Sequence, residues 1–161
     1  MGLESLVYAT LNPVMTGLLR SPIHGIASRN LCLLTYRGRR SGRTITTPLS
    51  FMREGNTVRL LTSQRTRWWL NFRDAPADVE LEIARQHFRG RARAITEDGD
   101  RYRDGIRRFL TAVPRDAPVY GIQLDKQRRP REESLAKAAG HVVLVEVELL
   151  DPPKGAHERE S

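Results

Sequence analysis

A short basic segment, Thr35 to Leu49, holds the residues whose types and spacing are best suited to chemistry. Its sequence is TYRGRRSGRTITTPL, in which four arginines and a serine surround two glycines. Guanidinium groups pair with phosphate oxygens through two parallel hydrogen bonds, and the exposed amides of a tight glycine turn complete such a site. The segment therefore predicts an anion-binding hairpin, and the anion we expect is the phosphate of a flavin-like cofactor. The plain alternative is a solvated hairpin tip, where glycine and arginine are both common.

Pro48 lies within the second strand of this expected hairpin. Proline cannot donate a hydrogen bond to a β-ladder, so an edge strand or a bulge is expected at this position. A bulge would expose backbone amides to a planar heterocycle, which favours the binding hypothesis over the solvated tip.

A second segment, Ser63 to Asn71, has the sequence SQRTRWWLN. A strand is expected to end at Ser63 and a helix to begin near Arg67, with Thr66 as its N-cap. A strand-to-helix turn with free amides, a hydroxyl and two arginines is typical of an anion site. The only tryptophans, Trp68 and Trp69, either anchor the short helix or include one ring that covers an aromatic ligand.

Residues for conventional catalysis are scarce. The four histidines are scattered, and no P-loop, nucleophile elbow or zinc-protease motif is present, so no metal site is predicted. Cys32 is the only cysteine and is expected to be a buried thiol. Because a redox cofactor needs only binding, orientation and electrostatics from the protein, this scarcity fits a cofactor-dependent enzyme and equally a binding protein.

Composition limits the functional classes. The chain has 161 residues, of which 39% are hydrophobic and 29% charged, as in one globular domain. A formal charge of +8 suits an anionic partner or a solvated arginine surface. A nucleic-acid partner is not predicted, because the arginine-bearing strand Phe88 to Ile95 carries one aromatic residue. Without a membrane-spanning run or signal peptide, a cytoplasmic protein is expected.

The elements that must position these segments are mostly strands. Alternating and turn-bounded apolar runs predict six strands: 31–36, 43–51, 57–63, 79–84, 88–95 and 141–149. Helical spacing predicts helices over 67–74 and 100–113, and a long loop over 116–140 holds a short helix near 132–139. Short turns between strands favour a mainly β (α+β) fold, a closed or split β-barrel with two or three peripheral helices.

The two ends of the chain are predicted separately. Residues 1–29 are expected to form an N-terminal helical segment interrupted at Pro13, and to belong to a single cofactor-binding domain that spans 1–150. The alternative for this segment is a surface-lying amphipathic helix, which would give weak association with the inner face of a membrane. Residues 151–161 are polar with two prolines and are expected to be a disordered tail.

The runs LLTYRGRRSGRTITTPLSF, LLTSQRTRWWLNFRD and VELEIARQHFRGRARAI together resemble the deazaflavin-dependent nitroreductase family. The resemblance covers about residues 12–113. It implies a split β-barrel, coenzyme F420 as cofactor, and hydride transfer from the reduced deazaflavin to a small quinone, nitroaromatic or enone. It leaves both a monomer and a homodimer open. Relatives in the wider group bind FMN, haem or fatty acids, so FMN, or a non-catalytic binding role, is the alternative.

The resemblance also implies a set of cofactor-binding residues. The basic turn would grip the phosphate and tail, the following strand would lie along the deazaflavin ring, and the second segment would close over the cofactor. These residues are Arg39, Arg40, Ser41, Gly42, Thr46, Thr47, Pro48, Leu49, Ser63, Arg65, Thr66, Trp69 and Asn71.

The chain departs from the family pattern at two places. Ile45 stands where the family often has an arginine, and Arg43 could replace that contact. The loop before Trp68 lacks the longer glycine-rich stretch and the His-Pro pair of well-studied members, which leaves the depth of the pocket open. No residue is identified as catalytic; a proton would come from solvent or from Tyr120, which lies in a loop that could close over the site.

Overall fold

The two strands that flank the arginine turn form a regular hairpin. The structure is a computed structural model that describes residues 30–150. In it β1 (Leu31–Arg37) pairs antiparallel with β2 (Thr44–Ser50), in unbroken register from Leu31↔Ser50 to Arg37↔Thr44. The apolar run of β1 and the threonine-rich β2 suit a pleated surface, which explains why both segments are strands.

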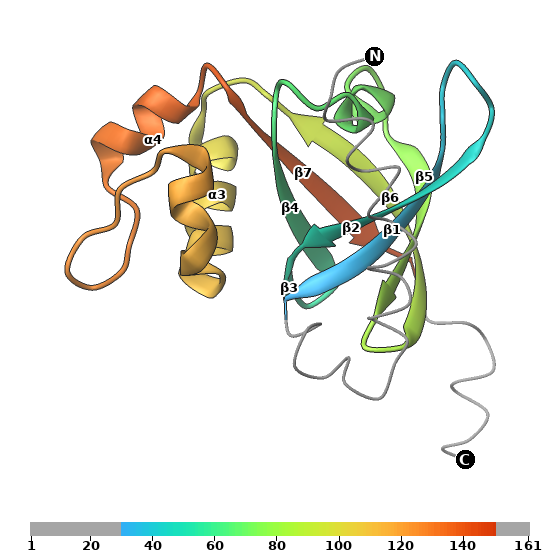
Figure 1. The fold of residues 1–161 in the computed structure, drawn as a ribbon, viewed down its shortest axis with the longest axis horizontal. Helices are drawn as coiled ribbons and strands as arrows, with labels where there is room; N and C mark the ends of the chain where they lie inside the picture. The colour runs from blue at the N-terminus through green and yellow to red at the C-terminus, as the bar shows by residue number, and fades with distance from the viewer. Residues whose placement is uncertain (1–29, 151–161) are drawn as a thin grey trace.

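Seven antiparallel strands form one sheet that curls into a half-barrel, with the β1–β2 hairpin crossing in front of the other strands (Figure 1). The strand order is β2-β1-β5-β6-β7-β4-β3, so β2 and β3 are the edges. The remaining strands are β3 (Met52–Glu54), β4 (Thr57–Ser63), β5 (Ala77–Ile83), β6 (Gln86–Ile95) and β7 (Val142–Leu149). The predicted mainly β barrel is confirmed, with seven strands instead of six because the three residues of β3 are too short to show a pattern.

The inner face of the barrel is the larger apolar core. Alternate residues of β7, Val143, Val145 and Val147, point into it and are fully buried. On the other face of β7, Leu144 packs under a helix while Glu146 and Glu148 lie on the outer surface. The alternation predicted for this strand is therefore confirmed, and it separates the core from a charged face.

Helices cover the opposite face near the ends of β4 and β7. Helix α3 (Asp100–Ala112) packs its apolar stripe on the sheet beside α4 (Glu132–Ala138), and both lie to one side of the barrel (Figure 1). The predicted loop also contains a short 3-10 helix, η2 (Pro114–Tyr120). The predicted helix 67–74 is a shorter 3-10 turn, η1 (Trp68–Phe72).

Two predictions concern residues outside the described part. The N-terminal helical segment, with its proposed membrane association, and the C-terminal tail both fall outside residues 30–150. Within the described part, no helix is long and apolar enough to cross a membrane.

Candidate cofactor site

The hairpin tip is closed by its own hydrogen bonds. The Gly38 N–H donates to the carbonyl oxygen of Arg43 at 2.8 Å, and the Gly42 N–H donates to the carbonyl oxygen of Gly38 at 2.9 Å. Gly42 has φ +68°, a left-handed conformation that favours glycine. The Ser41 hydroxyl oxygen accepts a further bond from the Arg43 N–H at 3.2 Å. The tip is therefore a defined turn that presents its side chains from a fixed backbone.

These bonds correct the expectation that the glycine turn exposes its amides. Four of its N–H groups, those of Gly38, Arg39, Gly42 and Arg43, already donate within the described chain. The amides of Arg40 and Ser41 are the remaining ones at the tip without an acceptor among residues 30–150. The anion-binding capacity of the turn therefore rests mainly on side chains.

The tip is tied to η1 by Arg39 and Asn71. The Arg39 N–H donates to Asn71 Oδ1 at 2.7 Å, and Arg39 Nη1 donates to the carbonyl oxygen of Leu70 at 3.2 Å and to Asp74 Oδ2 at 3.0 Å. Asn71 Nδ2 in turn donates to the carbonyl oxygen of Trp68 at 2.8 Å. The structure thus brings together the two segments that the sequence singled out, and it gives Arg39 and Asn71 a bracing role.

Electrostatics strengthen the same junction. Hydrogen bonds from Arg73 and then from Arg39 hold the pKa of Asp74 below its ordinary value. By contrast, the exposed side chains of Arg40 and Arg43 make no ion pair or hydrogen bond with any residue that the structure describes. The brace therefore uses one arginine and leaves two guanidiniums of the turn available to an external anion.

Strand β2 holds its residues in two different environments. Two hydrogen bonds at the ends of the β1–β2 ladder fix its phase: the Gly38 N–H donates to the carbonyl oxygen of Arg43, and the Phe51 N–H donates to the carbonyl oxygen of Asn30. The odd-numbered residues of β2 are therefore hydrogen-bonded to β1, and the backbone groups of its even-numbered residues point outward from the sheet edge. Pro48 occupies an outward position on an edge strand, so the edge expectation is confirmed. The bulge expectation is wrong, since the β1–β2 register is continuous.

The side chains of the four predicted β2 residues also divide between faces. Thr47 and Leu49 are buried on the barrel side, whereas Thr46 faces the other way and shares a 2.9 Å hydrogen bond with Thr35. A ligand lying along this strand would therefore meet backbone and one face, not all four side chains.

The turn from Ser63 to Thr66 differs from the predicted anion site. The amides of Gln64, Arg65 and Thr66 all donate within the chain, to His141 O, Ser63 Oγ and Ser63 O. Thr66 is not an N-cap: η1 follows Arg67 without a side-chain cap, because the Thr66 hydroxyl bonds Ser63 O at 2.8 Å. Arg65 remains exposed, with a guanidinium that no described residue pairs.

Trp68 and Trp69 both lie in the barrel core, 7% and 8% exposed. Trp68 Nε1 donates to Thr62 Oγ1 at 3.2 Å, and its ring meets Phe72 edge-on at 6.3 Å between centroids. Trp69 Nε1 is buried and has no hydrogen-bond partner, the one such side-chain atom among the described residues. Both rings anchor η1, and Trp69 alone keeps an N–H to offer to another group.

Thr62 is a positioning residue that sequence inspection missed. Its side chain is 4% exposed, and its hydroxyl meets both Trp68 Nε1 and, at 2.6 Å, Thr66 Oγ1. The available indication was a threonine directly after the apolar pair Leu60-Leu61 of this strand.

Tyr120 lies in the second core, on the helix-covered face. Its hydroxyl donates to the carbonyl oxygen of Leu61 at 2.9 Å. Leu61 lies on the part of β4 that extends past its pairing with β3. Two pockets lined wholly by described residues lie elsewhere, and none of the predicted cofactor-binding residues lines them.

Comparisons with known proteins bear on what this site serves. No curated protein matches the chain. A solved F420-H2 dependent reductase, FDR-A, superposes with a TM-score of 0.53 at 18% identity, covering 74% of this chain and 95% of that one. A second structure, described as a domain-swapped dimer, gives a TM-score of 0.51 at 17% identity over 83% and 99% of the two chains. At these identities the likeness shows the split-barrel fold alone.

The family is shown by a sequence model. The model of the F420H(2)-dependent quinone reductase family matches residues 21–127, more than half of the chain, including the hairpin, η1 and most of the sheet. The chain therefore belongs to the F420H2-dependent quinone reductase family, which makes it an oxidoreductase with coenzyme F420 as its cofactor.

Proposed function

We propose that this chain reduces a quinone with F420H2, and that the hairpin tip holds the phosphate of the cofactor. The observation that supports this proposal is that one arginine of the tip is hydrogen-bonded within the protein while two others are not. Arg39 is committed to the brace with Asn71 and Asp74, while Arg40, Arg43 and the Ser41 hydroxyl stay available on a rigid turn. The hydrogen-bonded backbone of the turn fixes where these side chains begin, and charge-assisted hydrogen bonds to phosphate offset the cost of ordering them.

The donors present fit a phosphate-bearing deazaflavin. Two unpaired guanidiniums and the amides of Arg40 and Ser41 suit the phosphate, and Arg65 adds a cation on the turn that precedes η1. The buried, unpartnered indole N–H of Trp69 suits a carbonyl acceptor on a heterocycle, because an orphaned buried donor is costly until a partner arrives. The family's usual arginine is replaced by Ile45, whose side chain is only partly buried, so Arg43 takes that role in our proposal.

The remaining residues orient the cofactor and shield it from water. When bound, F420H2 supplies the hydride that the acceptor takes up. Edge strand β2 offers outward backbone groups along one side, and the buried rings of Trp68, Trp69 and Phe72 keep water from the barrel side. We propose that the balancing proton comes from solvent, since the Tyr120 hydroxyl already donates to Leu61.

Titration of the full chain with F420, followed by cofactor fluorescence, tests this proposal. Arg40→Ala and Arg43→Ala should each weaken F420 binding by about tenfold or more, the value of one charge-assisted hydrogen bond. Arg89→Ala is the matched control, because Arg89 is also exposed and unpaired among described residues but lies on β6. Unchanged affinity in both hairpin variants would overturn the assignment of the site.

Two arms identify the cofactor and the acceptor. FMN titrated in parallel should bind more weakly than F420, and a quinone should be reduced faster than a nitroaromatic or an enone. Tighter binding of FMN would favour the alternative cofactor.

A homodimer and a cytoplasmic location stay predictions. Light scattering of the full chain checks the first.

A further inference from the structure

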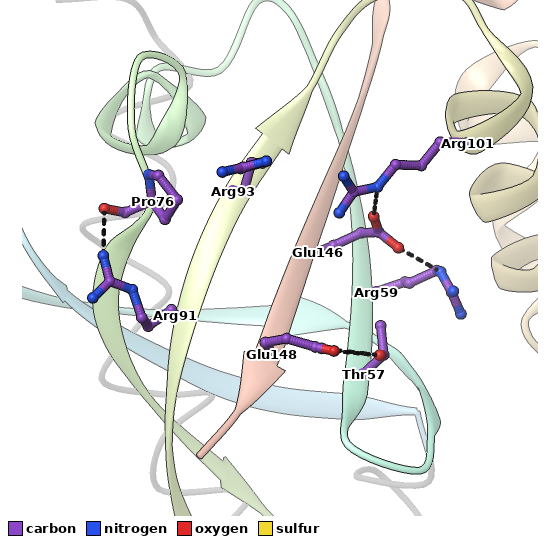
Figure 2. Close-up of a pocket in the computed structure, with 8 residues that line it drawn as sticks. All are labelled: Thr57, Arg59, Pro76, Arg91, Arg93, Arg101, Glu146 and Glu148. Carbon is purple, nitrogen blue, oxygen red and sulfur yellow. Dashed lines mark hydrogen bonds and ion pairs between the residues drawn. The ribbon is translucent and has the colours of Figure 1, made fainter.

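The outer face of the sheet carries a charged pocket far in sequence from the hairpin. It has a volume of about 490 Å³ and lies across β4, β6 and β7, with Arg101 of α3 at its rim (Figure 2). Four arginines and two glutamates line it, so positive charge is in excess. The lining residues are Thr57, Arg59, Pro76, Arg91, Arg93, Arg101, Glu146 and Glu148.

Glu146 pairs with two of these arginines, one at each of its carboxylate oxygens. Its Oε2 accepts from Arg59 Nε at 3.0 Å, and its Oε1 accepts from Arg101 Nε at 2.7 Å. The Glu146 side chain is 11% exposed, and both ion pairs are drawn in Figure 2. Each oxygen of this carboxylate therefore has a charged donor, and neither donor is Arg93.

Arg93 is left without a carboxylate. It lies directly opposite Glu146 in the β6–β7 register, yet it forms no ion pair with any residue that the structure describes. The other glutamate of the pocket, Glu148, accepts from the Thr57 hydroxyl at 3.1 Å. In a simple cross-strand ion-pair ladder each arginine would find its acid, and here one does not.

Arg91 is held only loosely. Its Nη2 donates to the carbonyl oxygen of Pro76 at 3.4 Å, and its Nη1 lies 3.9 Å from Asp78 Oδ1. Arg91 and Arg93 are two residues apart on one strand, so their side chains share the outer face, as Figure 2 shows. The pocket thus combines two loosely engaged guanidiniums with the unused nitrogens of Arg101.

We propose that this pocket binds a multiply charged small oxyanion, a phosphate ester or a polycarboxylate, at a site separate from the cofactor hairpin. Arg93 is the central ligand, flanked by Arg91 and Arg101. The backbone of the site is preformed, since its residues come from hydrogen-bonded strands and the first turn of α3. Glu146 holds Arg59 and Arg101 in place.

Calorimetric titration of the full chain with inorganic pyrophosphate, and separately with citrate, tests the proposal at an ionic strength held constant with NaCl. Wild-type protein should bind at least one of them saturably at one site. Arg93→Gln should weaken that binding by about tenfold or more, and Arg91→Gln should weaken it in the same direction. The probe that binds more tightly identifies the phosphate or the carboxylate class.

Two variants serve as controls. Arg89→Gln removes an arginine of the same β6 face that does not line the pocket, and it should leave binding unchanged. Arg40→Gln alters the hairpin and should also leave it unchanged. The proposal is overturned if neither probe gives more heat than a titration with NaCl of the same ionic strength. It is also overturned if Arg93→Gln and Arg91→Gln both bind like wild type, or if Arg40→Gln is the one variant that abolishes binding.

Discussion

The backbone N–H of Arg39 donates to Asn71 Oδ1 at 2.7 Å, and this bond joins the tip of the first hairpin to the turn that follows the fourth strand. Asn71 Nδ2 in turn donates to the carbonyl oxygen of Trp68. One side chain therefore sets the position of the basic turn relative to the aromatic cluster of the barrel.

Loss of this brace should weaken cofactor binding. Asn71→Ala removes the acceptor of Arg39 and the donor to Trp68, so we expect about 1–2 kcal/mol less stability and a clear loss of F420 affinity. Asn71→Asp keeps an oxygen for the Arg39 N–H and should retain more affinity than the alanine variant. Urea unfolding and F420 titration measure the two effects, and equal affinities for alanine and wild type would refute the bracing role.

The two adjacent tryptophans offer a matched pair. Trp68→Phe loses a hydrogen bond to Thr62 together with ring volume, whereas Trp69→Phe loses ring volume and relieves an unpartnered buried N–H. In urea unfolding without cofactor, Trp68→Phe should be the more destabilising by about 1 kcal/mol.

The order should reverse with cofactor present. If the Trp69 N–H donates to F420, Trp69→Phe will lose more of the cofactor-induced rise in Tm than Trp68→Phe. Equal losses in the two variants would show that Trp69 does not contact the cofactor through its N–H.

Acid should weaken the hairpin junction through Asp74. Bonds from Arg73 and Arg39 lower the folded pKa of Asp74 beneath its ordinary value of 3.8. A lowered carboxyl pKa contributes stability that is present above the ordinary pKa and is lost as the pH falls through the folded one. The stability difference between wild type and Asp74→Asn should therefore shrink as the pH falls below 3.8. A difference that stays constant down to the acid transition would contradict this.

Helix α3 should reject a larger residue at its contact with β7. A Cβ on Gly105 would overlap Leu144 Cδ2, and Leu144 is fully buried. Alanine gains about 1 kcal/mol of helix propensity over glycine, but overpacking costs about 1–3 kcal/mol, so Gly105→Ala should be destabilising overall. Thermal unfolding of Gly105→Ala in wild-type and Leu144→Val backgrounds checks this, because the smaller valine should reduce the cost.

Local patterns were sufficient to predict most elements of the described fold. The alternation of Val143, Val145 and Val147 against Glu146 and Glu148 predicts a strand with one apolar face, because side chains alternate across a strand. Strand β3 and helix η2 escaped prediction, since three residues carry no period and the prolines of η2 indicate a loop as readily as a turn.

The sequence determined the basic turn itself: four arginines, a serine and a glycine at the left-handed position of a hairpin. Tertiary structure decided which of these groups are available. Asn71 lies 32 positions from Arg39, and only the folded barrel brings the two together, so no local pattern could show that Arg39 is committed while Arg40 and Arg43 are not. The same holds for Arg93, whose opposing acid is occupied by Arg59 and Arg101 from other elements. The sequence specifies which donors and acceptors are present, but contacts between distant segments determine which of them are paired.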